Sequence, residues 1–257
     1  QGLVEVVLEF FLDLAESVAG PKLARRFFPL VMTIFLFIVT ANWMGILPGF
    51  GTIGWIESPK KVIEHAEHAL KDGRELDLKS VRLQVFDGDG GLALLAPGSV
   101  DSVTTAEEFE EHGVEVGKTA GLLVPFLRGV NTDINVTLGI ALVAMVMVHW
   151  WALTELGIGS HVGKFLNFRG GPIGLFVGVL EAISEVARVI SFTFRLFGNI
   201  FAGEVLLIAM AFLVPLIGLV PFLGLELFVG AIQAFIFAML TLVFAATASV
   251  SHGDESH

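Results

Sequence analysis

Six ionisable side chains interrupt the long apolar stretch between residues 173 and 250. A charge alone at membrane depth costs from about 3 to over 10 kcal/mol, so such residues have partners, water or a function. Partly desolvated carboxylates in a water-lined cleft suit proton transfer, because burial disfavours their charged form. Arginine stays protonated, so it attracts carboxylates or blocks an ion path instead of relaying protons. The six residues are Glu181, Glu185, Arg188, Arg195, Glu204 and Glu226.

The spacing of these residues separates the fixed cation from the carboxylates. Glu181, Arg188 and Arg195 are seven residues apart, so they drift by only about 20° per step around one helical face. Asn199 follows Arg195 by four residues and shares this face. Glu204 follows Arg195 by nine residues, which places it about half a turn away. The pattern predicts a permanent cation on one face of a helix and a titratable carboxylate on another.

The last apolar segment, 225–250, carries a second aligned pair. Glu226 and Gln233 are again seven residues apart and lie on one helical face. Both acids, Glu204 and Glu226, can also be explained by pairing with a structural cation elsewhere. Gln233 and Asn199 can likewise be explained as hydrogen-bonding groups between helices. The functional hypothesis is that these polar groups line a route for an ion.

The other charged residues of the stretch also have structural interpretations. Glu181 and Glu185 can pair with Arg188 near the cytoplasmic surface. Arg195 has no acidic residue three or four positions away, so a structural ion pair would need another helix or chain. In the preceding apolar segment, His149 is interpreted as an interfacial anchor and not as a ligand, because two tryptophans follow it.

The composition indicates that lipid is part of the solvent. Of 257 residues 54% are hydrophobic and 16% are charged, and the mean hydropathy is +0.80. The net charge of -11 is uneven, because 14 of the 26 acidic residues fall between positions 57 and 115. Cysteine is absent, which excludes disulfides and thiolate metal sites. The sequence also lacks a metal cluster, a nucleotide motif and a basic tract, so we expect no metal, no cofactor and no nucleic-acid partner.

The chain is predicted to be an all-α integral membrane protein with a small α+β insertion outside the membrane. Runs of about 20 apolar residues are long enough to cross a bilayer, and Lys and Arg mark the cytoplasmic ends. The predicted segments are an interfacial amphipathic helix at 1–26, a transmembrane helix at 27–48, an exterior loop with the insertion at 49–133, a transmembrane helix at 134–157, a cytoplasmic loop at 158–172, a tilted helix hairpin at 173–250 and a polar tail at 251–257.

The first of these segments is predicted to lie along the interface because it is too polar to span. Its acidic residues recur on one helical face, and Gly20-Pro21 should end the helix. Interfacial helices on bare lipid usually carry Lys and Arg, so we expect this acidic helix to pack against protein as well. The four acids are Glu5, Glu9, Asp13 and Glu16.

The insertion is predicted from changes in periodicity. Residues 60–71 favour a short charged helix, and a further acidic helix or loop should start at Thr105. Residues 81–86 alternate as a half-buried strand, 87–91 favour a turn, and 92–96 are expected to return as the second strand of a hairpin.

The hairpin at 173–250 must be strongly tilted or bent if it is helical. A helix of about 40 residues is about 60 Å long, which is twice the thickness of the hydrocarbon core. Gly198 and Gly203 are the candidate bend points.

Residues 191–204, which read SFTFRLFGNIFAGE, resemble the a subunit of F-type ATP synthase. The order RLFGN followed by AGE is a specific signature of the long tilted helix in that family. Three further pieces agree in the same order, and the resemblance covers nearly everything except about 57–120. They are ANWMGILP at 41–48, TDINVT at 132–137 and QAFIF at 233–237.

The resemblance implies a stator subunit that stands against a ring of c subunits. Arg195 would face the carboxylates of the ring and separate two aqueous half-channels for H⁺ or Na⁺. Asn199, Glu204, Glu226 and Gln233 would line the route, although some relatives carry histidine at the position of Glu226. Glu181 and Arg188 are secondary candidates. The implied partners are the c-ring, the b-subunit peripheral stalk, other F-type ATP synthase subunits and lipid. The chain would not be catalytic itself, and its implied location is the bacterial plasma membrane.

Two departures and two other classes of protein stay open. The first membrane helix of the family is missing, which agrees with a start at Gln1 that is not the true N-terminus, and whether such a helix precedes Gln1 stays open. The insertion is also longer than the corresponding loop of the family. A stand-alone secondary cation/proton transporter would often show inverted repeats, which are not visible in this sequence. A purely structural assembly subunit would have no need of a charge as costly as Arg195.

Overall fold

The computed structural model describes residues 2–47, 50–69, 77–88, 91–94, 100–157, 171–213 and 219–249. Most of the predicted loop at 158–172 and the whole tail at 251–257 lie outside these residues. The chain divides into two compact units. The helical unit contains residues 1–43, 130–206 and 224–257, and the insertion unit contains residues 44–129 and 207–223.

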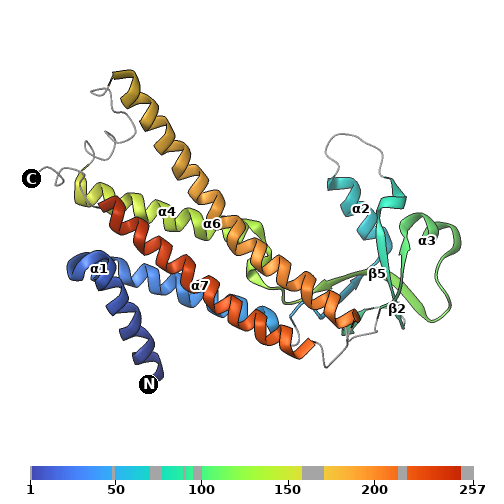
Figure 1. The fold of residues 1–257 in the computed structure, drawn as a ribbon. Helices are drawn as coiled ribbons and strands as arrows, with labels where there is room; N and C mark the ends of the chain where they lie inside the picture. The colour runs from blue at the N-terminus through green and yellow to red at the C-terminus, as the bar shows by residue number, and fades with distance from the viewer. Residues whose placement is uncertain are drawn as a thin grey trace, which may run out of the picture. The chain divides into compact units, whose positions relative to one another are not determined.

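Four long helices dominate the part of the chain that the structure describes (Figure 1). Within the described residues, three of them contain spans long and apolar enough to cross a membrane: Val4–Ile46, Ile134–Leu156 and Val220–Ser249. The fourth helix is 43 residues long and carries Glu181, Glu185, Arg188, Arg195 and Glu204. The four helices are α1 (Gly2–Ile46), α4 (Ile134–Leu156), α6 (Gly171–Leu213) and α7 (Leu219–Ser249).

Helix α1 consists of two arms that meet at Gly20 (Figure 1). Gly20 has φ 74° and ψ 160°, a conformation that glycine adopts without the steric cost of a side chain. Pro21 follows directly, so the predicted break at Gly20-Pro21 is confirmed. The first arm packs on protein as expected, because Phe11 lies 4.4 Å from the ring of Phe35 on the second arm and Ala15 is buried.

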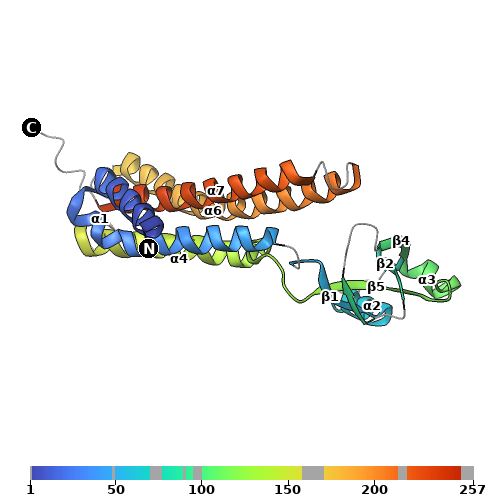
Figure 2. The same cartoon turned by 90° about the horizontal axis from the view of Figure 1, so that it is seen from below.

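The core of the helical unit lies between α1, α4, α6 and α7, with α1, α4 and α7 running side by side (Figure 2). Small residues let the backbones approach closely, and aromatic rings fill the remaining space. Phe192 of α6 stacks on Phe237 of α7 at 4.6 Å, and both rings are fully buried. Buried alanines line the same cluster: Ala141, Ala144 and Ala234.

A buried polar contact joins α1 to α7 and to the turn before α4. The Asn42 side chain donates to the carbonyl oxygen of Gly230 at 3.0 Å, and its Oδ1 accepts from Asn131 Nδ2 at 2.7 Å. Beside it, Trp43 Nε1 donates to the carbonyl oxygen of Leu227 at 3.0 Å. These bonds fix the C-terminal end of α1 against the part of α7 that carries Glu226.

The insertion unit contains a five-stranded antiparallel sheet with the order β3-β1-β5-β2-β4. Helices α2 (Pro59–Ala69) and α3 (Ala106–His112) pack on it. The predicted α+β insertion is therefore confirmed at this level. The strands are β1 (Ile53–Glu57), β2 (Arg82–Asp87), β3 (Leu92–Leu94), β4 (Val100–Thr105) and β5 (Lys118–Pro125).

The expected hairpin between 81–86 and 92–96 is wrong. Strand β3 pairs with β1, because both edges of β2 are occupied by β4 and β5.

The acidic helix or loop expected to start at Thr105 is a helix. Thr105 begins α3 with a capping box in which its side chain and that of Glu108 bond to each other's backbone. The hydrogen bond from the Thr105 backbone, with one from Thr104, lowers the pKa of Glu108.

We predict that Asn42→Ala destabilises the helical unit. The change leaves the buried Asn131 amide without its acceptor, which costs about 1–3 kcal/mol. Thermal unfolding of the purified chain in detergent, followed by circular dichroism, should show a lower Tm. The exposed Asn135→Ala is the control and should leave Tm unchanged. Replacing both Asn42 and Asn131 with leucine should recover part of the loss, and equal Tm values for all variants would contradict the prediction.

Candidate functional site

Arg195 projects from α6 on the side opposite to the packed core. Its neighbours Phe192, Leu196 and Ile200 are buried against the bundle, whereas the Arg195 side chain is exposed. Its guanidinium donates a long hydrogen bond of 3.4 Å to Ser191 Oγ. Among the residues that the structure describes, no carboxylate lies within ion-pair distance of Arg195. The guanidinium therefore points away from the chain with its charge uncompensated by the described residues.

The face of Arg195 also carries Arg188 and Asn199, but three further positions on it hold small residues. They are Ser191, Gly198 and Ala202, which lie four, three and seven residues from Arg195. None of these side chains is large enough to cover the guanidinium. An apolar helix could therefore pack closely against this face of α6, with the Arg195 guanidinium at the centre of the contact.

Glu226 of α7 lies against Gly203 of α6. A Cβ atom added at Gly203 would overlap the carboxylate of Glu226, so this close approach requires glycine. Glu204, the next residue, is close enough to interact electrostatically with Glu226. These two acids, which the resemblance assigns to the ion route, therefore lie near each other. Glu204 is exposed on the side of α6 away from Arg195.

Two buried amide groups point to a polar environment between α6 and α7. Within the described residues, Asn199 Nδ2 and Gln233 Nε2 are buried without a hydrogen-bond partner. Gln233 is 7% exposed. An unsatisfied buried amide costs about 1–3 kcal/mol, so these groups are expected to meet water or a group of another chain.

Arg188 is compensated within the chain, unlike Arg195. Glu185 accepts from Arg188 at 2.6 Å, and the guanidinium carbon lies 4.2 Å from the centre of the Phe244 ring. The local-pairing interpretation therefore holds for Arg188 and Glu185. Glu181 is half-buried one turn earlier on α6.

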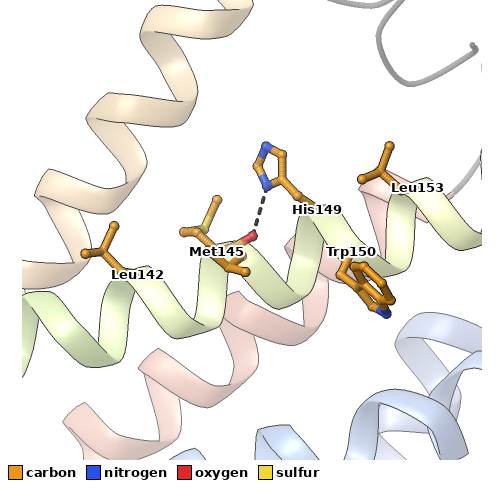
Figure 3. Close-up of a pocket in the computed structure, with 6 residues that line it drawn as sticks. Leu142, Met145, His149, Trp150 and Leu153 are labelled. Carbon is orange, nitrogen blue, oxygen red and sulfur yellow. Dashed lines mark hydrogen bonds between the residues drawn. The ribbon is translucent and has the colours of Figure 1, made fainter. Parts of the chain in front are cut away.

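His149 adds a contact that the sequence did not predict. Its Nδ1 lies 2.9 Å from the carbonyl oxygen of Met145, and its Nε2 lies 3.9 Å from Glu185 Oε2. Figure 3 shows the ring on α4 beside an open pocket of about 390 Å³. Because the pocket is lined by one apolar face of α4, it favours lipid or an apolar side chain over a polar ligand. Two residues on different helices form this contact, so spacing within the sequence carries no signal for it.

The arrangement has the parts of an ion path. The described residues contain no group of three or more possible metal ligands. They place an exposed cation on one face of α6 and two neighbouring carboxylates at another. Such a set can bind, release and redirect an ion.

Comparison with known proteins identifies similar chains. The family described as "ATP synthase A chain" matches residues 1–246. ATP synthase subunit a of Desulforamulus reducens is 36% identical over 141 residues, which cover 52% of this chain and 52% of that protein. The Mycobacterium ulcerans subunit is 29% identical over 243 residues, covering 93% of this chain and 70% of the relative. The Mycobacterium tuberculosis subunit is 30% identical over 232 residues, covering 89% and 65%. The match to the first of these relatives spans about half of its length.

We predict that Gly203→Ala impairs ion conduction, because the new methyl group displaces the Glu226 carboxylate. ATP-driven ion pumping in inverted membrane vesicles should fall at least about tenfold, as for misplaced groups at other functional sites. Gly224→Ala is the matched control, since its Cβ would meet open space on α7 near Glu226.

Combining Gly203→Ala with Glu226→Asp, whose shorter side chain makes room, should restore part of the activity. Normal pumping by Gly203→Ala in a fully assembled complex would contradict this prediction.

Proposed function

The chain belongs to the ATP synthase A chain family, and we propose that it is the ion-conducting stator subunit of an F-type ATP synthase. It is a multi-pass membrane protein with bacterial relatives. Together with the c-ring it forms two ion half-channels and couples the movement of H⁺ or Na⁺ to rotation and ATP synthesis. The chain contributes no catalytic group to ATP synthesis itself.

The exposed guanidinium of Arg195 is the observation that carries this proposal. A charge in an apolar helix needs a counter-charge or water, and none of the described residues supplies the counter-charge. A carboxylate on a passing ring helix would supply it. In low dielectric Arg195 would favour the ionised form of this carboxylate, so the ring site would release its ion there.

The small residues beside Arg195 support the approach of a ring. Ser191, Gly198 and Ala202 leave the face low enough for a neighbouring helix to pass close to the guanidinium. Family membership implies other F-type ATP synthase subunits as partners. More specifically, we assign the Arg195 face to the c-ring, and we expect the b-subunit peripheral stalk to hold the chain still.

The polar groups away from this face supply the two routes to it. Glu204 and Glu226 are neighbours and would be costly if dry, so they line one water-accessible half-channel. The buried amides of Asn199 and Gln233 continue this route towards Arg195. Arg188 is compensated by Glu185, so it does not act as a second separator. With Glu181 it belongs to the cytoplasmic side of the route.

The length of α6 supports a strongly tilted hairpin. At about 1.5 Å per residue its 43 residues extend about 65 Å, which exceeds a hydrocarbon core of about 30 Å. The hairpin at 173–250 would thus lie far from the membrane normal along the ring, while residues 1–26 lie at the interface. Helix orientations under about 30° from the normal in oriented bilayers would contradict this arrangement.

We predict that Arg195→Ala abolishes coupled ATP synthesis and that Arg195→Lys loses at least about tenfold, since lysine lacks the planar fork and can be neutralised in this setting. Loss of the separator should also let ions leak between the half-channels in Arg195→Ala. The measurements are ATP synthesis and passive ion flux in vesicles that contain assembled mutant complexes.

Lysine at the compensated position, Arg188→Lys, is the matched control and should retain most of the activity. Near-normal synthesis by Arg195→Ala would end the stator interpretation.

A further inference from the structure

Three helices of the helical unit contribute to one charged cluster around Arg188. Within α6, Arg188 Nη1 donates to Glu185 Oε1 at 2.6 Å. From α7, the ring of Phe244 lies against the guanidinium, whose carbon is 4.2 Å from the ring centre. The Arg188 side chain is 29% exposed and that of Glu185 is 21% exposed. The ion pair is thus partly withdrawn from the surroundings of the helices, where a lone charge would be costly.

The second oxygen of Glu185 is enclosed from the side of α4. Its Oε2 is buried and accepts no hydrogen bond from the described residues. His149 Nε2 lies 3.9 Å from this oxygen. The imidazole is itself held in place, because its Nδ1 lies 2.9 Å from the carbonyl oxygen of Met145 (Figure 3). Glu185 is therefore kept between Arg188 and α4, and it cannot turn outwards without leaving both.

The position of Arg188 makes this pair relevant to Arg195. The two arginines are seven residues apart on one face of α6, which is about 10.5 Å along the helix axis. In a medium of low dielectric constant a charge acts over this distance with little screening. A ring carboxylate at Arg195 would therefore respond to Arg188 as a second cation if Glu185 did not cancel the charge.

The charges on the neighbouring elements do not take over this task among the described residues. Helix α7 has one ionisable side chain, Glu226, which lies near its other end. Where α1 and α4 carry charges on this side, Arg26 and Glu155 bind each other. Glu181 precedes Arg188 by seven residues, beyond the three- or four-residue spacing at which helical side chains meet.

We propose that Glu185 is a positioning residue of the ion path. It cancels the charge of Arg188, which leaves Arg195 as the cation that acts on a passing ring carboxylate. Phe244 and His149 hold the pair in place from α7 and α4. Glu185 acts through Arg188 and does not carry the ion itself. This inference rests on the proposed function, because it concerns the ring carboxylate that meets Arg195.

The concentration of the pumped ion that gives half-maximal ATP-driven pumping tests this role in inverted vesicles with assembled complexes. In Glu185→Gln, the uncompensated Arg188 favours the ionised ring carboxylate, so the ring needs more H⁺ or Na⁺ to refill. The half-maximal concentration should rise at least about threefold, which is about half a pH unit for H⁺. A merely structural role of Glu185 would lower the maximal rate and leave this concentration unchanged.

Two further variants separate charge cancellation from other effects. The double variant Glu185→Gln/Arg188→Gln has neither charge, so it should return the half-maximal concentration to the wild-type value. Glu155→Gln is the matched control, because it makes the same chemical change in the other pair of Arg and Glu, with Arg26. It should leave the half-maximal concentration unchanged.

An unchanged half-maximal concentration in Glu185→Gln would overturn the inference. A shift that persists in the double variant would also overturn it, because Glu185 would then act on the ion directly. If Glu185→Gln does not assemble, Glu185→Asp, whose shorter side chain reaches Arg188 less well, repeats the test and should shift the concentration in the same direction. None of these results touches the stator role, which depends on the loss of activity in Arg195→Ala.

Discussion

A permanently charged guanidinium on an apolar helix is the constraint on which the rest of this structure depends. Arg195 cannot lose its proton, and the described residues offer it a single long hydrogen bond to Ser191. The packing of α6 accommodates this charge by burying the opposite face through Phe192, Leu196 and Ile200. The fold therefore leaves the cation exposed instead of compensating it with the described residues.

The remaining contacts hold the carboxylates at a distance from this cation. Gly203 lets α7 approach closely enough for Glu226 to reach the neighbourhood of Glu204, on the far side of α6 from Arg195. The Asn42 bonds fix α7 near this point. Arg188, in contrast, is compensated by Glu185 and Phe244. Arg195 is thus an exposed cation, and Glu204 and Glu226 are a pair of acids separate from it. The proposed stator role between two half-channels requires such a separation.

Features that depend on near neighbours in the chain could be predicted from the sequence. The break at Gly20, the strand at 82–87, the cap at Thr105 and the Arg188–Glu185 pair all follow from local spacing. Features that depend on distant segments could not be predicted. The pairing of β3 with β1, the contact of His149 with Glu185 and the Asn42–Asn131 bond join residues whose proximity only packing decides. The site residues were found because charge is rare in apolar helices, although their partners in other chains are not part of this sequence.

Disulfide cross-linking tests the central claim most directly, namely that the Arg195 face meets the ring. Ser191→Cys and Ala202→Cys lie on this face, and Ile190→Cys is an exposed position of similar depth on another face. Each is combined with a cysteine beside the carboxylate of the ring subunit in the assembled complex. The account predicts cross-links from positions 191 and 202 and none from position 190. Cross-linking from 190 alone, in a complex that still makes ATP, would contradict it.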